Sequence, residues 1–219
     1  GASAVIADID MAAAEELATS LGDRAAAAAC DVRDEGQVEA AVAQSVSRFG
    51  RLDYMVNNAG YLIFAPVVET AAEDWRAILD VNVTGVFLSM KYEIRQMLDQ
   101  GSGTIVNNAS MLGLAGSAGA APYAASKHGV VGLTRTAALE YAKRGIRVNA
   151  ICPSFTNTAM LQRMIDQDPK LEQILNNASP MKRMGEPGEE ASAVAFLCSD
   201  EASFTNGQAL ALDGGIAAW

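Results

Sequence analysis

The sequence contains little cysteine, a single histidine and few basic residues. Cys30, Cys152 and Cys198 are odd in number and far apart, which excludes a disulfide framework and the close ligand spacing of a zinc site. Lys and Arg together number 16 against 26 Asp and Glu, so the net charge is −10. A chain this acidic is a poor partner for nucleic acid or for an anionic membrane surface. We therefore expect no metal site, no nucleic-acid partner and no membrane partner.

Long apolar runs are also missing. No stretch approaches the ~20 apolar residues that a membrane-spanning helix needs, and no basic segment precedes an apolar run with a cleavage site. We expect a soluble, cytoplasmic protein. Hydrophobic residues make up 50% of the chain and charged residues 19%, which excludes a disordered polymer. With 219 residues the chain is long enough for one sizeable core, and we expect a single domain.

Short aliphatic runs alternate with longer segments of helical period along the whole chain. We expect strands at residues 4–7, 25–30, 52–56, 103–107, 147–151 and 208–212. Helices are expected at residues 11–21, 35–49, 74–98, 123–143 and 187–198. The five alanines at residues 25–29 favour helix, but only about four residues separate them from the next helix, so we assign them to a strand. The alternation predicts an α/β fold in which crossover helices cover a parallel sheet.

A long excursion lies between the last two strands. Residues 155–185 are rich in Met, Gln, Asn and Asp, and excursions of this length are often lids or binding loops. We expect a substrate lid there. Met181 and Met184 in the excursion, with Leu112 and Leu114 after the fourth strand, favour an apolar or alicyclic substrate, although Met-rich stripes also form ordinary cores.

Tyr123 and Lys127 form the first candidate catalytic pair. They stand in the run Tyr-Ala-Ala-Ser-Lys at the start of an expected helix, where a spacing of four places both on one face. A phenol ordinarily titrates near pH ~10, and a fixed positive charge in a dry site lowers its pKa toward neutrality. The alternative is a helix surface with an ordinary tyrosine and an ordinary lysine.

Further motifs accompany this pair. Residues 57–60, Asn-Asn-Ala-Gly, end an expected strand, where ligands bind in open α/β sheets. Residues 82–85, Asn-Val-Thr-Gly, lie in an expected helix, and Ser110 follows a strand thirteen residues before Tyr123. Together with residues 153–158 after the next strand, these motifs resemble in type, order and spacing those of the short-chain dehydrogenase/reductase family.

The resemblance covers essentially all 219 residues, through Leu-Asp-Gly-Gly at residues 212–215. It implies a Rossmann-like, doubly wound parallel sheet in three αβα layers. It also implies an NAD-dependent oxidoreductase, similar to bacterial alcohol dehydrogenases and 3-oxoacyl reductases, that interconverts a secondary alcohol and a ketone. Family members of this kind usually form tetramers through two long helices, here residues 74–98 and 123–143, so we expect a homotetramer. The alternative is a catalytically inactive family-like subunit or scaffold that does not bind dinucleotide.

The resemblance implies catalytic roles for four residues. Tyr123 would be the general acid/base that exchanges a proton with the substrate oxygen, and Ser110 would orient that oxygen. Lys127 would lower the pKa of Tyr123 and hold the nicotinamide ribose, while Asn82 would hold a water that links Lys127 to solvent. Without the resemblance, Ser110 is interpreted as a turn serine and Asn82 as a helix-interior asparagine.

Asp8 carries the prediction of NAD rather than NADP. At the end of the first strand its carboxylate would accept hydrogen bonds from the adenosine ribose hydroxyls and repel a 2′-phosphate. The alternative is an N-cap for the helix at residues 11–21, a role that Asp10 could also fill. The resemblance assigns further residues to the cofactor site, in addition to Tyr123 and Lys127: Ile9, Asp31, Val32, Asn58, Ala59, Gly60, Pro153, Thr156 and Thr158.

The chain departs from the family pattern in two places. Pro153-Ser154 stands where the family has Pro-Gly, which predicts a backbone less free to adopt positive φ. The glycine-rich phosphate loop, with its strand and helix, is absent from the 219 residues. Because that strand lies in the middle of the sheet, the strands at residues 4–7 and 52–56 would each have an open edge. We expect the sequence to be the remainder of a longer chain; a truncated, inactive chain and a rearranged sheet are the alternatives.

Overall fold

The structure, a computed structural model, describes residues 1–218. In this part of the chain the strands are β1 (Ala4–Asp8), β2 (Ala25–Ala29), β3 (Tyr54–Asn57), β4 (Gly103–Asn108), β5 (Ile146–Pro153) and β6 (Ala209–Leu212). Backbone pairing orders them β1-β2 and β3-β4-β5-β6, and every neighbouring pair is parallel. The predicted α/β fold with a parallel sheet is confirmed, and each expected strand is present with its ends shifted by at most two residues.

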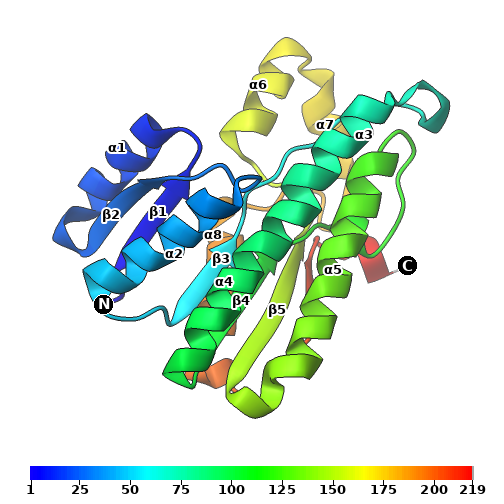
Figure 1. Cartoon of the computed structure of the whole chain (residues 1–219). Helices are drawn as coiled ribbons and strands as arrows, with labels where there is room; N and C mark the ends of the chain where they lie inside the picture. Colours follow the sequence, from blue (N-terminus) through cyan, green and yellow to red (C-terminus); the bar gives the residue numbers. More distant parts are fainter. Residues whose placement is uncertain (219) are drawn as a thin grey trace.

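Helices cover both faces of the sheet. They are α1 (Met11–Leu21), α2 (Glu35–Phe49), α3 (Ala72–Leu79), α4 (Gly85–Gln100), α5 (Ala121–Tyr141), α6 (Ala159–Gln167), α7 (Lys170–Ala178) and α8 (Pro187–Cys198). Figure 1 shows α2, α4 and α5 in front of the sheet, α8 behind it, and α6 and α7 beyond its upper edge. None of the helices within residues 1–218 is long and apolar enough to cross a membrane.

The single helix that we expected at residues 74–98 is interrupted. Between α3 and α4 the chain makes a π-helical turn at Asp80–Thr84, and Asn82 is fully buried in this turn. A π-turn contains one more residue than an α-turn, and such turns are frequent at functional sites. The hydrophobic pattern predicts the helical segment because its apolar stripe continues on both sides of the turn, but the pattern does not reveal the extra residue.

The five alanines form strand β2, as predicted. They pair with β1 from Ala4 opposite Ala25 to Asp8 opposite Ala29. Parallel pairing with a neighbouring strand therefore overrides the helix preference of alanine. Their small side chains allow α1 and α2 to pack closely on this pair of strands.

The main core lies between strands β4 and β5 and helices α4 and α5. Ile105 of β4, Val148 of β5 and Val130 of α5 are all completely buried in it. Removing each such side chain from water contributes roughly 1.5–3 kcal/mol. This packed block fixes the carboxyl ends of β4 and β5.

A cavity of about 480 Å³ lies between β1 and β3. Ala7 and Asp8 of β1 line one side, and Met55 and Asn57 of β3 line the other. Within residues 1–218, β1 pairs only with β2, and β3 pairs only with β4. These are the two strands for which the sequence predicted open edges.

Candidate active site

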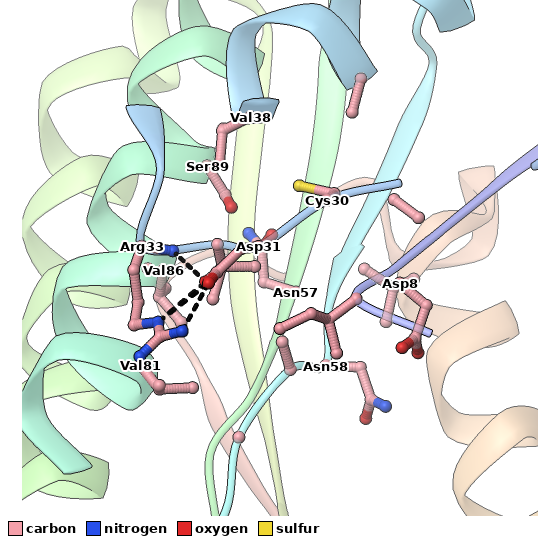
Figure 2. Close-up of a pocket in the computed structure, with 18 of the residues that line it drawn as sticks. Asp8, Cys30, Asp31, Arg33, Val38, Asn57, Asn58, Val81, Val86 and Ser89 are labelled. Atoms are coloured by element: carbon pink, nitrogen blue, oxygen red, sulfur yellow. Dashed lines mark hydrogen bonds and ion pairs between the residues drawn. The ribbon is translucent and has the colours of Figure 1, made fainter. Parts of the chain in front are cut away.

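The carboxyl ends of β1, β2 and β3 meet at the cavity between β1 and β3 (Figure 2). This is where the fold of a parallel sheet gathers the residues that follow its strands. Seven of the predicted cofactor residues line the cavity: Asp8, Ile9, Asp31, Val32, Asn58, Ala59 and Gly60. The structure thus brings these seven residues together, and their role in cofactor binding stays a prediction.

Asp8 and Asp10 have separate roles at the end of β1. The side chain of Asp10 caps α1 by accepting a hydrogen bond from Ala13 N at 3.1 Å. Asp8 instead accepts a hydrogen bond from Asp10 N at 2.9 Å, and its exposed carboxylate faces the cavity. The alternative that Asp8 is the helix cap is wrong, because Asp10 occupies that position.

Asp31 is tied to Arg33 (Figure 2). Its carboxylate accepts two hydrogen bonds from Arg33 Nε, at 2.9 and 3.1 Å, and one from the backbone N of Arg33 at 3.0 Å. These hydrogen bonds lower the pKa of Asp31 to about 2. The guanidinium of Arg33 is thus paired with Asp31 in the same loop, and Asp31 remains charged at neutral pH.

The predicted catalytic residues meet at the carboxyl ends of β4 and β5. Tyr123 lies in the first turn of α5, and Lys127 lies one turn later with its Nζ 5.5 Å from the centre of the Tyr123 ring. Lys127 Nζ donates a hydrogen bond to the carbonyl of Asn108, at the end of β4, at 2.7 Å. Ser110 is buried directly after β4, and its hydroxyl accepts a hydrogen bond from Leu112 N at 3.1 Å.

The pKa shifts at this site have burial as their main cause. Burial lowers the pKa of Lys127 to about 8, so the ammonium keeps its charge at neutral pH. Burial also raises the pKa of Tyr123, the hydrogen bond with Ser110 lowers it, and the carboxylate of Glu190 raises it further. The sequence predicted a lowered pKa for Tyr123. The protein environment alone gives the opposite direction, because desolvation of the phenolate is the largest effect.

Asn82 holds the loop after β3 and the start of α5. Its side chain donates to Tyr61 O at 2.9 Å and accepts from Tyr61 N at 3.1 Å. It also donates to Ser126 Oγ at 3.1 Å, and Ser126 in turn donates to Tyr123 O at 2.7 Å. The buried side chain of Asn82 therefore joins the loop after β3 to the start of α5 through hydrogen bonds. The alternative interpretation, an ordinary asparagine inside a helix, does not account for these bonds.

Gly60 shows how closely these segments approach one another. A Cβ atom at Gly60 would lie 3.2 Å from Asn82 Oδ1 and 3.6 Å from Lys127 Nζ. A side chain at this position would press on Asn82 and lie in van der Waals contact with Lys127 Nζ. Lys127 and the wall of the cavity therefore lie next to one another.

Pro153 is the last residue of β5, and Thr156 and Thr158 follow it at the same edge of the sheet. The hydroxyl of Thr156 donates a hydrogen bond to Glu190 of α8, and Thr158 caps α6. Lys182 is the only non-glycine residue within residues 1–218 with a positive φ, so Ser154 has an ordinary backbone conformation. The departure from Pro-Gly consequently introduces no strain at this turn.

Sequence reasoning missed a buried polar network below the site. Glu93 accepts a hydrogen bond from Asn57, Asn57 donates to Asn107, and Asn107 donates to Thr134 of α5. One signal was available in the sequence, because Glu93 interrupts an apolar stripe at helical spacing, formed by Val86, Met90 and Met97.

Known proteins resemble the chain over nearly its whole length. The family model described as enoyl-(acyl carrier protein) reductase matches residues 1–217. The 2,5-dichloro-2,5-cyclohexadiene-1,4-diol dehydrogenase of Sphingobium indicum is 46% identical over 220 residues, which cover 100% of this chain and 88% of that protein. Cyclohexanol dehydrogenase of an Acinetobacter species is 40% identical over 218 residues, 98% of this chain and 84% of that one.

Solved structures with the same fold carry dinucleotides of both kinds. NAD⁺-bound xylitol dehydrogenase superposes with a TM-score of 0.93 at 37% identity, covering 98% of this chain and 89% of that one. ElxO with NADP bound superposes with a TM-score of 0.93 at 32% identity, covering 98% and 88%. The fold thus accommodates NAD in one relative and NADP in another.

Proposed function

Because the chain belongs to the short-chain dehydrogenase/reductase family and is an oxidoreductase acting on CH–OH groups, we propose that it interconverts a secondary alcohol and a ketone with NAD. The observation that carries this proposal is the convergence of Ser110, Tyr123 and Lys127 at the carboxyl edge of the sheet, where Gly60 of the cavity wall lies close to Lys127. Open α/β sheets bind ligands at this edge.

The residues around the cavity fit a dinucleotide. Asp8 presents an exposed carboxylate there, and Gly60 allows the backbone to pass close to Lys127. NAD is favoured over NADP because Asp8 would repel a 2′-phosphate, and because Arg33, a cation elsewhere in the cavity wall, is held by Asp31. Pro153, Thr156 and Thr158 are proposed to hold the nicotinamide end. When bound, the cofactor supplies the hydride acceptor or donor.

The chain's own residues would move the proton. Tyr123 exchanges it with the substrate oxygen as general acid/base, and Ser110 orients that oxygen by a hydrogen bond. The charge of Lys127, 5.5 Å from the ring, stabilises the phenolate that forms when Tyr123 acts as a base. Asn82, buried between Tyr61 and Ser126, keeps the start of α5 aligned with the loop after β3.

The substrate is proposed to be apolar and alicyclic. Two relatives are named for a dichlorocyclohexadienediol and for cyclohexanol, and the apolar side chains of Met181 and Leu114 are exposed. Helices α6 and α7 lie beyond the upper edge of the sheet (Figure 1), and we propose residues 155–185 as the substrate lid of a single domain. A cytoplasmic homotetramer is proposed from the family resemblance.

A panel of secondary alcohols tests the function. The purified protein is mixed with NAD⁺ or NADP⁺ and each alcohol, and NADH or NADPH formation is followed by absorbance. We expect turnover with cyclohexanols and preference for NAD⁺. NADH fluorescence enhancement measures binding separately. If neither binding nor turnover occurs with any pair, the inactive subunit or scaffold replaces the proposed enzyme.

A further inference from the structure

Glu93 of α4 is a completely buried acid that the proposed reaction does not use. Its Oε2 accepts a hydrogen bond from Asn57 Nδ2 at 3.1 Å. Its Oε1 is buried and has no hydrogen-bond partner within residues 1–218, and the side chain lines the cavity between β1 and β3. Burying a carboxyl group is costly, so the placement of Glu93 in the core calls for an explanation.

The residue that Glu93 holds begins the Asn-Asn-Ala-Gly segment. Asn57 is the last residue of β3, and its amide also donates to Asn107 Oδ1 on β4 at 2.9 Å. These two asparagines stand opposite one another in the parallel register. The bond from Asn57 to Glu93 therefore ties the carboxyl end of β3 to helix α4, while the bond to Asn107 ties it to β4.

The same helical stretch holds the other end of this segment. Asn82, eleven residues before Glu93, binds both the N–H and the carbonyl of Tyr61. Residues 57–61 are therefore clamped at their first residue by Glu93 and at their last residue by Asn82. Between these clamps Gly60 passes next to Lys127 Nζ, and Asn58 accepts a hydrogen bond from Asn108, whose carbonyl holds the same lysine.

We propose that Glu93 is a positioning residue, which acts through Asn57 to fix residues 57–61 against Lys127 and the cofactor cavity. This inference rests on the proposed function for its effect on catalysis, but the clamp itself does not. The carboxyl group acts on the site through its hydrogen bond to Asn57. Its role is to keep the loop that separates the catalytic lysine from the cavity in one conformation.

Two substitutions and a control separate this role from general core packing. Glu93→Gln keeps an oxygen that accepts from Asn57, whereas Glu93→Leu keeps the volume and removes the bond. Ile94→Val, at the adjacent buried position of α4, is the control for a loss of packing in the same helix. We expect Glu93→Leu to raise the KM for NAD⁺ or lower kcat on the order of tenfold, because small misplacements at a site are costly. Glu93→Gln and Ile94→Val should stay within about twofold of the unaltered protein.

Amide hydrogen exchange provides a readout that needs no cofactor and no turnover. Glu93→Leu should accelerate exchange at residues 58–61 on the order of tenfold and leave β5 unchanged, while Glu93→Gln restores protection. If the protein oxidises no alcohol but shows this pattern, the proposed function fails and the clamp stands. Unchanged kinetics and unchanged exchange at residues 58–61 in a folded Glu93→Leu protein would overturn the clamp. If Glu93→Leu does not fold, Asn57→Ala removes the donor of the same hydrogen bond. Faster exchange at residues 58–61 in that variant would support the clamp, and unchanged exchange with unchanged kinetics would overturn it.

Discussion

The two sides of the carboxyl edge hold their functional groups in different ways. On the β4–β5 side, Ser110 and Lys127 are buried, and Lys127 is bound to the carbonyl of Asn108. On the β1–β2 side, Asp8 is exposed and Ile9 keeps 69% of its surface exposed. A cavity of about 480 Å³ separates this side from β3.

The difference separates chemistry from cofactor selection. Groups that stabilise a developing charge work best when buried hydrogen bonds hold them in place before the reaction begins. A residue that only selects between two nucleotides can remain at an exposed strand end. We therefore expect substitutions on the β4–β5 side to change turnover, and substitutions at the end of β1 to change the choice of cofactor.

The largest expected effect is on the buried side. Tyr123→Phe removes the oxygen that transfers the proton and leaves Lys127 in place, so kcat should fall about 10²–10⁴-fold while NADH binding, measured by fluorescence, stays nearly unchanged. Tyr141→Phe, at the other end of α5, is the matched control and should keep normal turnover. Retention of more than about a tenth of the original kcat by Tyr123→Phe would contradict the acid/base role.

The next effect concerns the free energy of unfolding and its dependence on pH through Glu93. Burial raises the pKa of Glu93 from about 4.5 to about 8, and the hydrogen bond from Asn57 only partly opposes this. The folded protein thus holds a proton that the unfolded chain releases, so stability is greatest below about pH 4.5 for this group and falls as pH rises toward 8.

Urea unfolding between pH 5 and 8 measures this dependence. Glu93→Gln cannot ionise, and its stability should exceed that of the unaltered protein by on the order of a few kcal/mol at the alkaline end. The gap should close toward pH 5. Parallel stability curves for the two proteins would show that Glu93 is not held protonated.

A smaller effect is expected on the exposed side. NAD should exceed NADP in kcat/KM by about tenfold or more, which corresponds to ~1.4 kcal/mol, because Asp8 repels the 2′-phosphate. Asp8→Ala should narrow this ratio. Asp10→Ala is the control, since it removes the cap of α1 and costs ~1 kcal/mol of stability without changing the ratio. If Asp8→Ala leaves the ratio of kcat/KM for NAD to that for NADP unchanged, Asp8 does not determine the cofactor preference.

The smallest effect tests the turn after β5. Ser154 has no positive φ, so Ser154→Gly, which restores the family's Pro-Gly, should relieve no strain. Added backbone freedom in the unfolded chain should instead lower stability by about 0.5–1 kcal/mol. Thermal unfolding of the two proteins decides, and a clear rise in Tm for the glycine variant would show strain at Ser154.

Much of the fold could be predicted because its signals are local. Strand and helix positions follow from apolar runs and helical spacing, and even the alanines of β2 could be placed from the short distance to the next helix. Tyr123, Lys127 and Ser110 could be identified because their types and spacing form a specific pattern. Parallel strands then bring their carboxyl ends to one edge, which explains why residues chosen from separate motifs lie close together in the structure.

The interactions that sequence did not predict join elements far apart in the chain. The bond between Glu93 and Asn57 spans helix α4 and strand β3, and the bond between Thr156 and Glu190 spans a loop and helix α8. The direction of the Tyr123 pKa shift depends on how deeply the phenol is buried, which no spacing of residues reveals. Such features follow from tertiary packing and become visible only when it is known.

The π-helical turn at Asp80–Thr84 sets the phase between α3 and α4. One additional residue in a helical turn rotates everything before it by about 100° relative to a continuous α-helix. Ile78 of α3 and Glu93 of α4 are both completely buried. Packing therefore fixes the rotation of each helix about its own axis. Deleting one residue of this turn would allow α3 and α4 to join in one continuous α-helix. In that helix either Ile78 or Glu93 would rotate out of the core toward solvent. The length of this turn is therefore as tightly constrained by packing as the buried side chains on either side of it.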